Sequence, residues 1–143
     1  MADVHDKATR SFNMSRIRSK NTKPELLLRS TLFSNGYRYR LHDKGLPGKP
    51  DIVLKKYRTV IFVNGCFWHG HKDCKYYVIP KTRTEWWENK IAVNIQNDFQ
   101  KRTQLINLGW KYIDVFECEL KKDKLERTLT NIYTTLKKNQ ADA

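Results

Sequence analysis

The sequence predicts an α/β fold, with helices packed against a β-sheet, and three observations lead to this prediction. Residues 59–63 form an apolar, β-branched run that is typical of a buried central strand. Residues 22–36 carry the start signal, apolar face and stop signal of a helix. The predicted elements follow in the order helix, three strands, helix, strand, helix. A length of 143 residues corresponds to about one domain, so we expect a single domain over residues 1–143.

The first predicted helix has clear boundary signals. Thr22 and Glu25 fit a capping box, and Pro24 is tolerated in the first turn. Gly36 is a natural stop, because glycine readily adopts the backbone conformation that closes a helix. We expect the apolar face of this helix to consist of Leu26, Leu27, Leu28, Leu32 and Phe33.

Three strands are predicted next. Residues 37–41 alternate as a half-exposed strand does. Residues 46–50 form a turn that delivers Asp51 to the start of a second strand, residues 51–54. A short joint at residues 55–58 then leads into the third strand, residues 59–63.

The remainder of the chain predicts a helix, a strand and a helix. Thr84 is the expected cap of a long helix that runs through Leu108 and is closed by Gly109. Residues 110–116 predict a fourth strand, and residues 122–138 predict the last helix.

The composition is strongly basic. The chain has 28 Lys and Arg against 15 Asp and Glu, a net charge of +13. Such a surface favours polyanions, of which nucleic acid is the commonest, although a protein that is merely basic has the same balance. Residues 1–50 hold 11 basic and 4 acidic side chains. We therefore expect residues 1–21 to be an arm that contacts phosphate.

Other features bear on the cellular compartment. No apolar run approaches the roughly 18 residues of a membrane span, and the first residues lack the hydrophobic segment of a signal peptide. Three cysteines suit a reducing compartment better than a disulfide framework. We expect a cytoplasmic protein.

Cys66, His71, Cys74 and Cys118 together make a Cys₃His set, a recognised tetrahedral zinc combination. Isolated cysteines are more often small buried hydrophobic residues. That alternative would not place two of them in one short loop with a histidine. The pattern predicts a structural zinc site, and four protein ligands would leave no open position for catalysis.

Asp51 follows Pro50 at the start of a predicted strand. This position puts its carboxylate at the edge of the sheet, where the end of the neighbouring strand can add a second oxygen ligand. Hard cations such as Mg²⁺ prefer oxygen clusters of this kind together with a substrate phosphate. Pro-Asp is also a common turn dipeptide, so the motif alone is weak. Its place between an early helix and two strands is the layout of the PD-(D/E)xK nuclease core.

His69 lies between the predicted zinc ligands and is out of step with them. A neutral imidazole near pH 7 could deprotonate a water for attack on phosphate. Two alternatives are a supporting hydrogen bond and a role as zinc ligand in place of His71.

Two aromatic pairs and one polar stripe have both a structural and a functional interpretation. Phe67-Trp68 and Trp86-Trp87 would usually be core residues, yet a basic protein can wedge such rings between bases. Lys90, Asn94 and Asp98 share one face of the long helix, which is ordinarily a solvated stripe. If that face looks toward a DNA groove, Lys and Asn are suitable partners for base edges.

Several motifs together resemble the very short patch repair (Vsr) endonucleases, which nick DNA beside a thymine mispaired with guanine. The resemblance covers the chain to about Glu119. The matching segments are residues 1–11, Asn13-Met14, Leu46-Pro47-Gly48 with Pro50-Asp51, Gly65-Cys66-Phe67-Trp68-His69 and Thr82-Arg83-Thr84-Glu85.

The resemblance implies a restriction-endonuclease-like fold, a mixed sheet flanked by helices, with an N-terminal arm (1–21) and a catalytic core (22–143). It implies structural zinc on Cys66, His71, Cys74 and Cys118. It further implies that Asp51 and the backbone carbonyl of Val63 hold Mg²⁺, that His69 is the base or orients the attacking water, and that Glu25 supports the centre.

The resemblance also implies DNA contacts and one departure. Its aromatic wedge falls on Phe67, Trp68 and Trp87, and its mismatch-reading positions on Lys90 and Asn94. Met14 and Ile17 of the arm would approach from the minor groove. The better-known family pattern has a histidine at the position of Asn64. Asparagine can orient a phosphate or water but cannot shuttle a proton near neutrality, which puts more weight on His69.

The expected activity is therefore Mg²⁺-dependent hydrolysis of one phosphodiester on the 5′ side of the thymine in a T·G mispair, which would initiate repair of deaminated 5-methylcytosine. The alternatives are a restriction-type nuclease on matched DNA and a non-catalytic, zinc-stabilised DNA-binding module. We expect a monomer in the bacterial cytoplasm, associated with the nucleoid, with mismatch-repair proteins as partners implied by the family alone.

Overall fold

The computed structural model of the protein describes residues 21–141. The predicted order of helices and strands is confirmed. The predicted arm, with Met14 and Ile17, lies almost wholly outside the described residues. The elements are α2 (Lys23–Ser34), β1 (Arg40–Leu41), β2 (Ile52–Leu54), η1 (Lys55–Tyr57), β3 (Thr59–Asn64), α3 (Thr84–Asn107), β4 (Lys111–Phe116), η2 (Glu117–Leu120) and α4 (Leu125–Ala141), where η denotes a short 3₁₀ helix.

The four strands form one mixed sheet in the order β1-β2-β3-β4. β1, β2 and β3 are antiparallel neighbours, whereas β3 and β4 run parallel. The parallel pair needs a crossover connection, and α3 supplies it. In consequence the end of β3, the end of β4 and the start of β2 all lie at one edge of the sheet.

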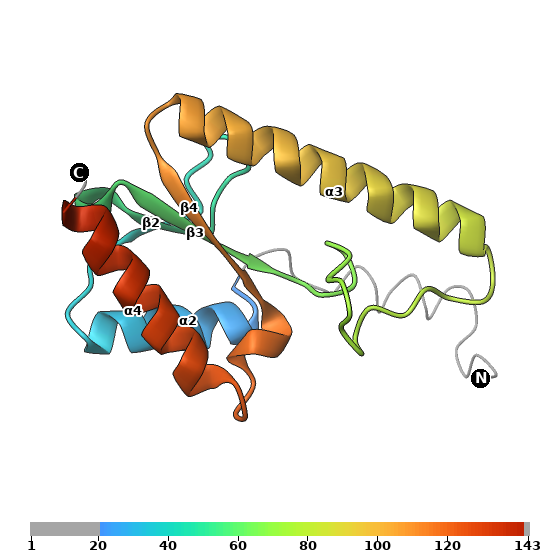
Figure 1. Ribbon diagram of the computed structural model, residues 1–143, viewed down its shortest axis with the longest axis horizontal. Coiled ribbons are helices and arrows are strands. Elements are labelled where there is room, and N and C mark those ends of the chain that lie inside the picture. Colours follow the sequence, from blue (N-terminus) through green and yellow to red (C-terminus); the bar gives the residue numbers. More distant parts are fainter. Residues whose placement is uncertain (1–20, 142–143) are drawn as a thin grey trace.

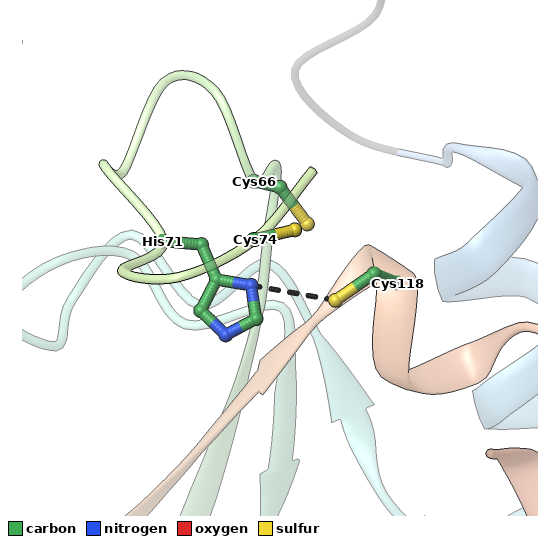
Figure 2. Close-up of side chains that lie close together, drawn as sticks. All are labelled: Cys66, His71, Cys74 and Cys118. Carbon is green, nitrogen blue, oxygen red and sulfur yellow. Dashed lines mark hydrogen bonds between the residues drawn. The ribbon is translucent and has the colours of Figure 1, made fainter. Parts of the chain in front are cut away.

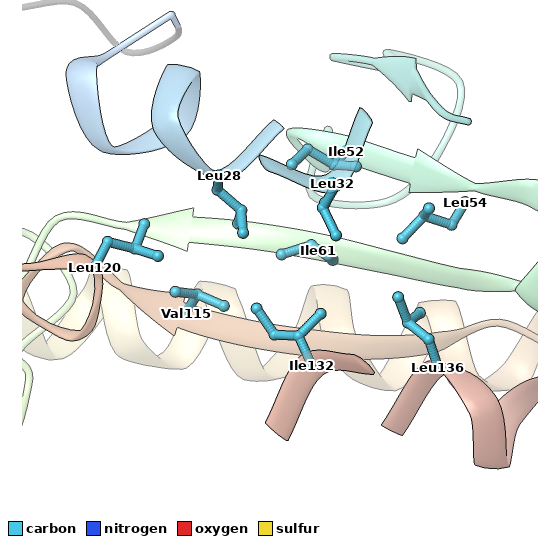
Figure 3. Close-up of a cluster of buried hydrophobic side chains, with 9 residues drawn as sticks. All are labelled: Leu28, Leu32, Ile52, Leu54, Ile61, Val115, Leu120, Ile132 and Leu136. Carbon is cyan, nitrogen blue, oxygen red and sulfur yellow. The ribbon is translucent and has the colours of Figure 1, made fainter. Parts of the chain in front are cut away.

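Helices cover both faces of the sheet. α2 and α4 lie on one face and the long helix α3 on the other (Figure 1). Side chains of a strand alternate between faces, so every residue of β2 is buried. Figure 3 shows the core beneath α2 and α4, which consists of Leu28, Leu32, Ile52, Leu54, Ile61, Val115, Leu120, Ile132 and Leu136.

A smaller core lies on the opposite face of the sheet. It consists of Val53, Val60, Phe62, Leu105 and Trp110. Leu105 belongs to α3, so this cluster fixes the C-terminal half of that helix to the sheet. Between residues 21 and 141, none of the helices combines the length and apolar character that a membrane crossing needs.

The predicted strand at residues 37–41 is wrong in its first half, since β1 contains only Arg40 and Leu41. The backbone N–H of Tyr37 instead bonds the carbonyl of Leu32 at the end of α2. Its ring stacks on Tyr133 of α4, with the centroids 5.5 Å apart. Tertiary packing of this aromatic residue therefore replaces strand pairing.

The predicted face of α2 and the predicted cap of α3 also need correction. Of the five apolar residues expected to face the core, only Leu28 and Leu32 are buried, whereas Leu26, Leu27 and Phe33 are exposed. Thr84 is the first helical residue of α3 rather than its cap. The cap position is Arg83 in a left-handed conformation, and the Thr84 hydroxyl donates to the carbonyl of Pro80.

Candidate active site

The candidate site lies at the sheet edge where β2 begins and β3 ends. Asp51 comes directly before β2, and its Oδ2 accepts a hydrogen bond of 2.7 Å from the backbone N–H of Val63 in β3. This contact follows from the antiparallel register, which pairs Ile52 with Ile61. The structure thus brings the Asp51 carboxylate and the backbone of Val63 together.

A buried carboxylate lies beside Asp51. Glu25, in the first turn of α2, is 1% exposed, and its Oε2 lies 2.9 Å from both Arg29 Nη1 and His42 Nε2. The predicted capping contact is present as well, because the Glu25 N–H donates to Thr22 Oγ1 at 3.4 Å. One ligand atom each from Glu25, His42 and Asp51 lies within 4.8 Å of the others, so these three side chains could share a cation.

The electrostatics of Asp51 suit a bound cation. Burial, together with the charge of Glu25, raises the pKa of the Asp51 carboxyl to about 6, although the hydrogen bond from Val63 and the nearby His42 and His69 lower it. The Asp51 carboxylate is therefore costly to ionise in the metal-free site. A hard divalent cation bound to these oxygens would supply the positive charge that stabilises the ionised form. The residues present therefore fit Mg²⁺.

His69 is the candidate base of the site. Its Nδ1 lies 2.5 Å from Oδ2 of Asp98 on α3. An ionised carboxylate only accepts hydrogen bonds, so this contact places the imidazole proton on Nδ1 and leaves the lone pair of Nε2 free. The arrangement can accept a proton from water. Asp98 entered the sequence analysis only as part of a polar stripe.

The loop that carries His69 is fastened to α3 at a second point. Asn94 Nδ2 donates a hydrogen bond of 2.9 Å to the backbone carbonyl of Trp68. The predicted base-reading residue Asn94 thus uses one amide hydrogen within the protein. Lys90, one turn earlier on the helix, is exposed.

The predicted wedge residues form part of an aromatic cluster. Phe67 packs against Trp68, with centroids 5.2 Å apart, and against Trp87, at 5.4 Å. Trp68 and Trp87 are themselves 5.8 Å apart. All three side chains are half-buried, so they are neither core residues nor fully exposed. The cluster joins the loop to the first turn of α3.

The Cys/His set converges, as Figure 2 shows. One ligand atom from each of Cys66, His71, Cys74 and Cys118 lies within 4.8 Å of the others, and His71 Nδ1 is 3.3 Å from Cys118 Sγ. The His71 ring stacks on Phe116, with centroids 3.9 Å apart. All three cysteines are free thiols, and burial and the neighbouring thiols raise the pKa of Cys118 to about 12. Crowded thiols with a converging imidazole fit a tetrahedral zinc ion.

Asn64 lies at the end of β3 with its side chain directed at two charged residues. Its Nδ2 donates to Asp114 Oδ1 at 2.9 Å, and its Oδ1 accepts from Arg102 Nη2 at 3.5 Å. Asn64 is 4% exposed. Its amide is therefore committed to a buried polar group at the edge of the site.

Two cavities meet at this edge of the sheet. The larger, about 1580 Å³, is bordered by Glu25 and by the aromatic residues Phe67 and Trp68. The smaller, about 390 Å³, is bordered by Asp51 and Asn64. Val63 and His69 line both. The candidate base and the candidate metal position are therefore accessible from the same open space.

Sequence reasoning missed two members of the site. His42 directly follows β1, and the antiparallel pairing of Leu41 with Ile52 places it opposite Asp51; its N–H donates to the Asp51 carbonyl. A predicted hairpin register could have found it. Arg102 gave no signal, because a lone arginine on a helix is ordinarily solvated.

Comparison with known proteins gives the family. A family model described as DNA mismatch endonuclease Vsr matches residues 2–76. The DNA mismatch endonuclease Vsr of Escherichia coli (strain K12) is 48% identical over 126 residues, which cover 87% of this chain and 80% of that protein. The chain belongs to the Vsr family of DNA mismatch endonucleases.

Other Vsr relatives carry the name of nicking enzymes. Type II nicking enzyme V.NmeAIP of Neisseria meningitidis serogroup A is 49% identical over 131 residues, covering 92% of this chain and 93% of that enzyme. Type II nicking enzyme V.XorIIP of Xanthomonas oryzae is 47% identical over 133 residues, covering 92% and 97%. This Vsr-family protein is thus a DNA endonuclease, and its mixed sheet flanked by helices is consistent with the restriction-endonuclease-like fold.

Proposed function

We propose that the protein nicks double-stranded DNA on the 5′ side of the thymine in a T·G mispair, and so initiates very short patch repair of deaminated 5-methylcytosine. Its membership of the mismatch endonuclease family supports this proposal. The observation that carries the chemistry is the convergence of Asp51, Val63 and the His69–Asp98 pair at one edge of the sheet.

Asp51 and the backbone carbonyl of Val63 would hold the catalytic Mg²⁺. When bound, the ion would supply positive charge to the scissile phosphate and acidify a coordinated water. Glu25 supports the centre from α2, where it fixes His42 beside Asp51 by the 2.9 Å contact.

His69 would take the proton from the attacking water through Nε2, since Nδ1 is committed to Asp98. Asn64 would not carry the proton, and its amide would support the edge of the site through its contacts with Asp114 and Arg102. The reaction cleaves one P–O bond and leaves a nick with a 3′-hydroxyl.

Zinc on the Cys66, His71, Cys74 and Cys118 cluster would make the loop rigid. Its four protein ligands would leave no position for substrate, so its role is structural. The ion would connect the segment after β3, which carries His69, to the segment after β4.

Recognition of the mispair would use the aromatic cluster. Insertion of Phe67, Trp68 and Trp87 into the stack costs least at a mispair, where stacking is already weakened. Lys90 and Asn94 would contact base edges, and Met14 and Ile17, outside the described residues, remain predictions for the minor-groove side. We further propose that the whole chain is one catalytic domain, monomeric, cytoplasmic and bound to nucleoid DNA, with mismatch-repair proteins as partners.

The deciding experiment incubates T·G and T·A duplexes with the wild type and with Asp51→Ala, with and without Mg²⁺. We expect Mg²⁺-dependent nicking of the T·G duplex alone, and its loss in the variant. Equal cutting of both duplexes would indicate a restriction-type nuclease. Binding without cutting under all conditions would indicate a non-catalytic DNA-binding module.

A further inference from the structure

We propose that Arg102 is a positioning residue of the active site, which holds Asp98 in place so that Asp98 orients His69. The inference rests on the role of His69 proposed above. Three contacts follow one another: Arg102 is anchored to the sheet, Arg102 contacts Asp98, and Asp98 contacts His69.

Arg102 is a buried cation with a fixed orientation. It is 7% exposed, and its guanidinium carbon lies 3.6 Å from the centroid of the Phe62 ring. Two of its nitrogens bond the carboxylate of Asp114 in β4, Nη2 at 2.5 Å and Nε at 3.3 Å. A two-point bond to a carboxylate fixes the plane of the guanidinium as well as its position.

Asn64 completes the anchorage. Its Nδ2 donates at 2.9 Å to Asp114 Oδ1, the oxygen that Arg102 Nη2 also bonds. Its Oδ1 accepts from Arg102 Nη2 at 3.5 Å. Asn64 and Asp114 belong to β3 and β4, the two parallel strands of the sheet. Arg102 is therefore anchored to both parallel strands, and the side chain of Asn64 has a structural purpose.

The third guanidinium nitrogen is directed at the active site. Nη1 lies 3.9 Å from Oδ1 of Asp98, which is one turn earlier on α3. The other carboxylate oxygen of Asp98 bonds His69 Nδ1 at 2.5 Å. Asp98 is thus held between a buried cation and the candidate base.

The contact between Asp98 and His69 needs support because both side chains are partly exposed to solvent. The side chains of Asp98 and His69 are 29% and 30% exposed, so water could replace their mutual bond. Arg102, the partner of Asp98, is buried, so this ion pair is less screened than a surface pair. Without Arg102 the carboxylate of Asp98 could rotate toward solvent. His69 would then lose the contact that keeps its proton on Nδ1 and Nε2 available.

The test compares Arg102→Met and Arg102→Lys with the wild type in the full-length protein. We expect Arg102→Met to lower the single-turnover rate of nicking at saturating T·G duplex by about tenfold to a hundredfold, with little change in duplex affinity. Nitrogen-15 NMR of the DNA-free protein should show His69 losing its single Nδ1-protonated tautomer. Arg102→Lys, which keeps the charge but not the two-point bond, should fall between the two.

Two comparisons separate positioning from general destabilisation. In an Asp98→Asn background, Arg102→Met should slow nicking no further, because it acts through Asp98. The matched control is Lys101→Met, which removes one charge from the adjacent, exposed helix position and should leave the His69 tautomer unchanged.

Different failures have different meanings. Full nicking by His69→Ala would overturn the proposed role of His69 itself. If His69→Ala is inactive while Arg102→Met has the wild-type rate and tautomer, only the role of Arg102 is wrong. Equal slowing by Arg102→Met with and without Asp98→Asn would show a merely structural residue and also overturn the proposal. Should Arg102→Met fail to fold, Arg102→Lys decides by the same two readouts.

Discussion

At the scale of single residues, Asp51 lies where a negative charge is costly unless a cation accompanies it. Burial is the largest cause, and the charge of Glu25 adds to it. The carboxyl therefore ionises in the folded protein with a pKa of about 6, against 3.8 for an ordinary aspartate. This difference links the stability of the metal-free protein to pH.

The sign of that link follows from proton binding. Between pH 4 and 6 the folded state holds a proton on Asp51 that the unfolded state has lost, so stability falls as pH rises through this range. Asp51→Asn removes the effect. In Mg²⁺-free buffer at pH 7.5 we expect the variant to be more stable by up to about 3 kcal/mol, and at pH 4 to match the wild type. Urea unfolding across this pH range measures both.

Magnesium supplies the control for this prediction. At pH 7.5, added Mg²⁺ should raise the unfolding midpoint of the wild type and leave that of Asp51→Asn unchanged, because binding to the folded state alone is stabilising. A variant that is no more stable than the wild type at pH 7.5 would contradict the burial argument.

Single residues also show how much of the candidate site could be predicted from the sequence. Asp51 could be indicated locally by its place at a strand start. The local sequence indicated Glu25 only as a helix-cap residue, and its place at the centre was implied by the family resemblance. His42 could have been found only from a predicted register of the β1–β2 hairpin. Arg102 could not be found, because its contacts depend on which elements meet in three dimensions. Asn64 was expected to orient phosphate or water, whereas its amide lies between Asp114 and Arg102.

At the scale of elements, the segment between β3 and α3 is held against the helix by very close packing. Gly70 has a φ of +58°, and a Cβ at this position would lie 2.7 Å from Ile95 Cδ1 and 2.9 Å from Ile91 Cγ2. Ile91 is buried, so it cannot easily move away. Only glycine fits this approach without strain.

Gly70→Ala should therefore separate the loop from α3. We expect a loss of about 2 kcal/mol in the free energy of unfolding, from steric overlap and the left-handed backbone together, and slower nicking. Gly36→Ala is the matched control, since Gly36 has a φ of +90° but no atom within 4 Å of the added Cβ. Differential scanning calorimetry and a nicking assay distinguish the two variants. Equal losses would show that close packing at Gly70 is unimportant.

The Cys/His cluster gives a second prediction for the loop. Cys74→Ser should lower stability and nicking together, because one of four ligands is lost and the loop is no longer fixed. His69→Ala should fold normally and lose nicking. Metal analysis of the purified proteins should find zinc in His69→Ala and less in Cys74→Ser. If Cys74→Ser left both properties untouched, the structural role of the cluster would be wrong.

Element boundaries were harder to predict than the elements themselves. The β-branched run in β3 was found because two-sided burial demands an unbroken apolar sequence. Thr84 was wrongly predicted as the cap of α3, because its hydroxyl donates to the carbonyl of Pro80 and does not accept from a free N–H of the helix. Local sequence does not show which of these partners a threonine will take.

At the scale of the whole molecule, the net charge of +13 is the dominant property. Each phosphate that a basic side chain neutralises releases a counterion, so affinity for DNA depends on salt. This contribution is independent of base sequence. Under the proposed function, discrimination of a mispair would come from the aromatic and polar groups around the loop.

We therefore expect the dissociation constants for T·G and T·A duplexes to rise in parallel by at least about tenfold between 50 and 200 mM salt. The ratio of the two constants should change little. Fluorescence anisotropy with labelled duplexes measures both. A ratio that collapses at high salt would mean that discrimination itself depends on phosphate contacts.

The long helix α3 has one more consequence. It contacts the aromatic cluster through Trp87 and the candidate base through Asp98, eleven residues later. At 1.5 Å per residue these points are about 16 Å apart along the axis. Under the proposed roles, α3 would keep the aromatic cluster and the candidate base at a fixed separation, and the distance from mispair to cut would then be a property of the protein. Relatives could then change the bases that they prefer without moving the position at which they cut.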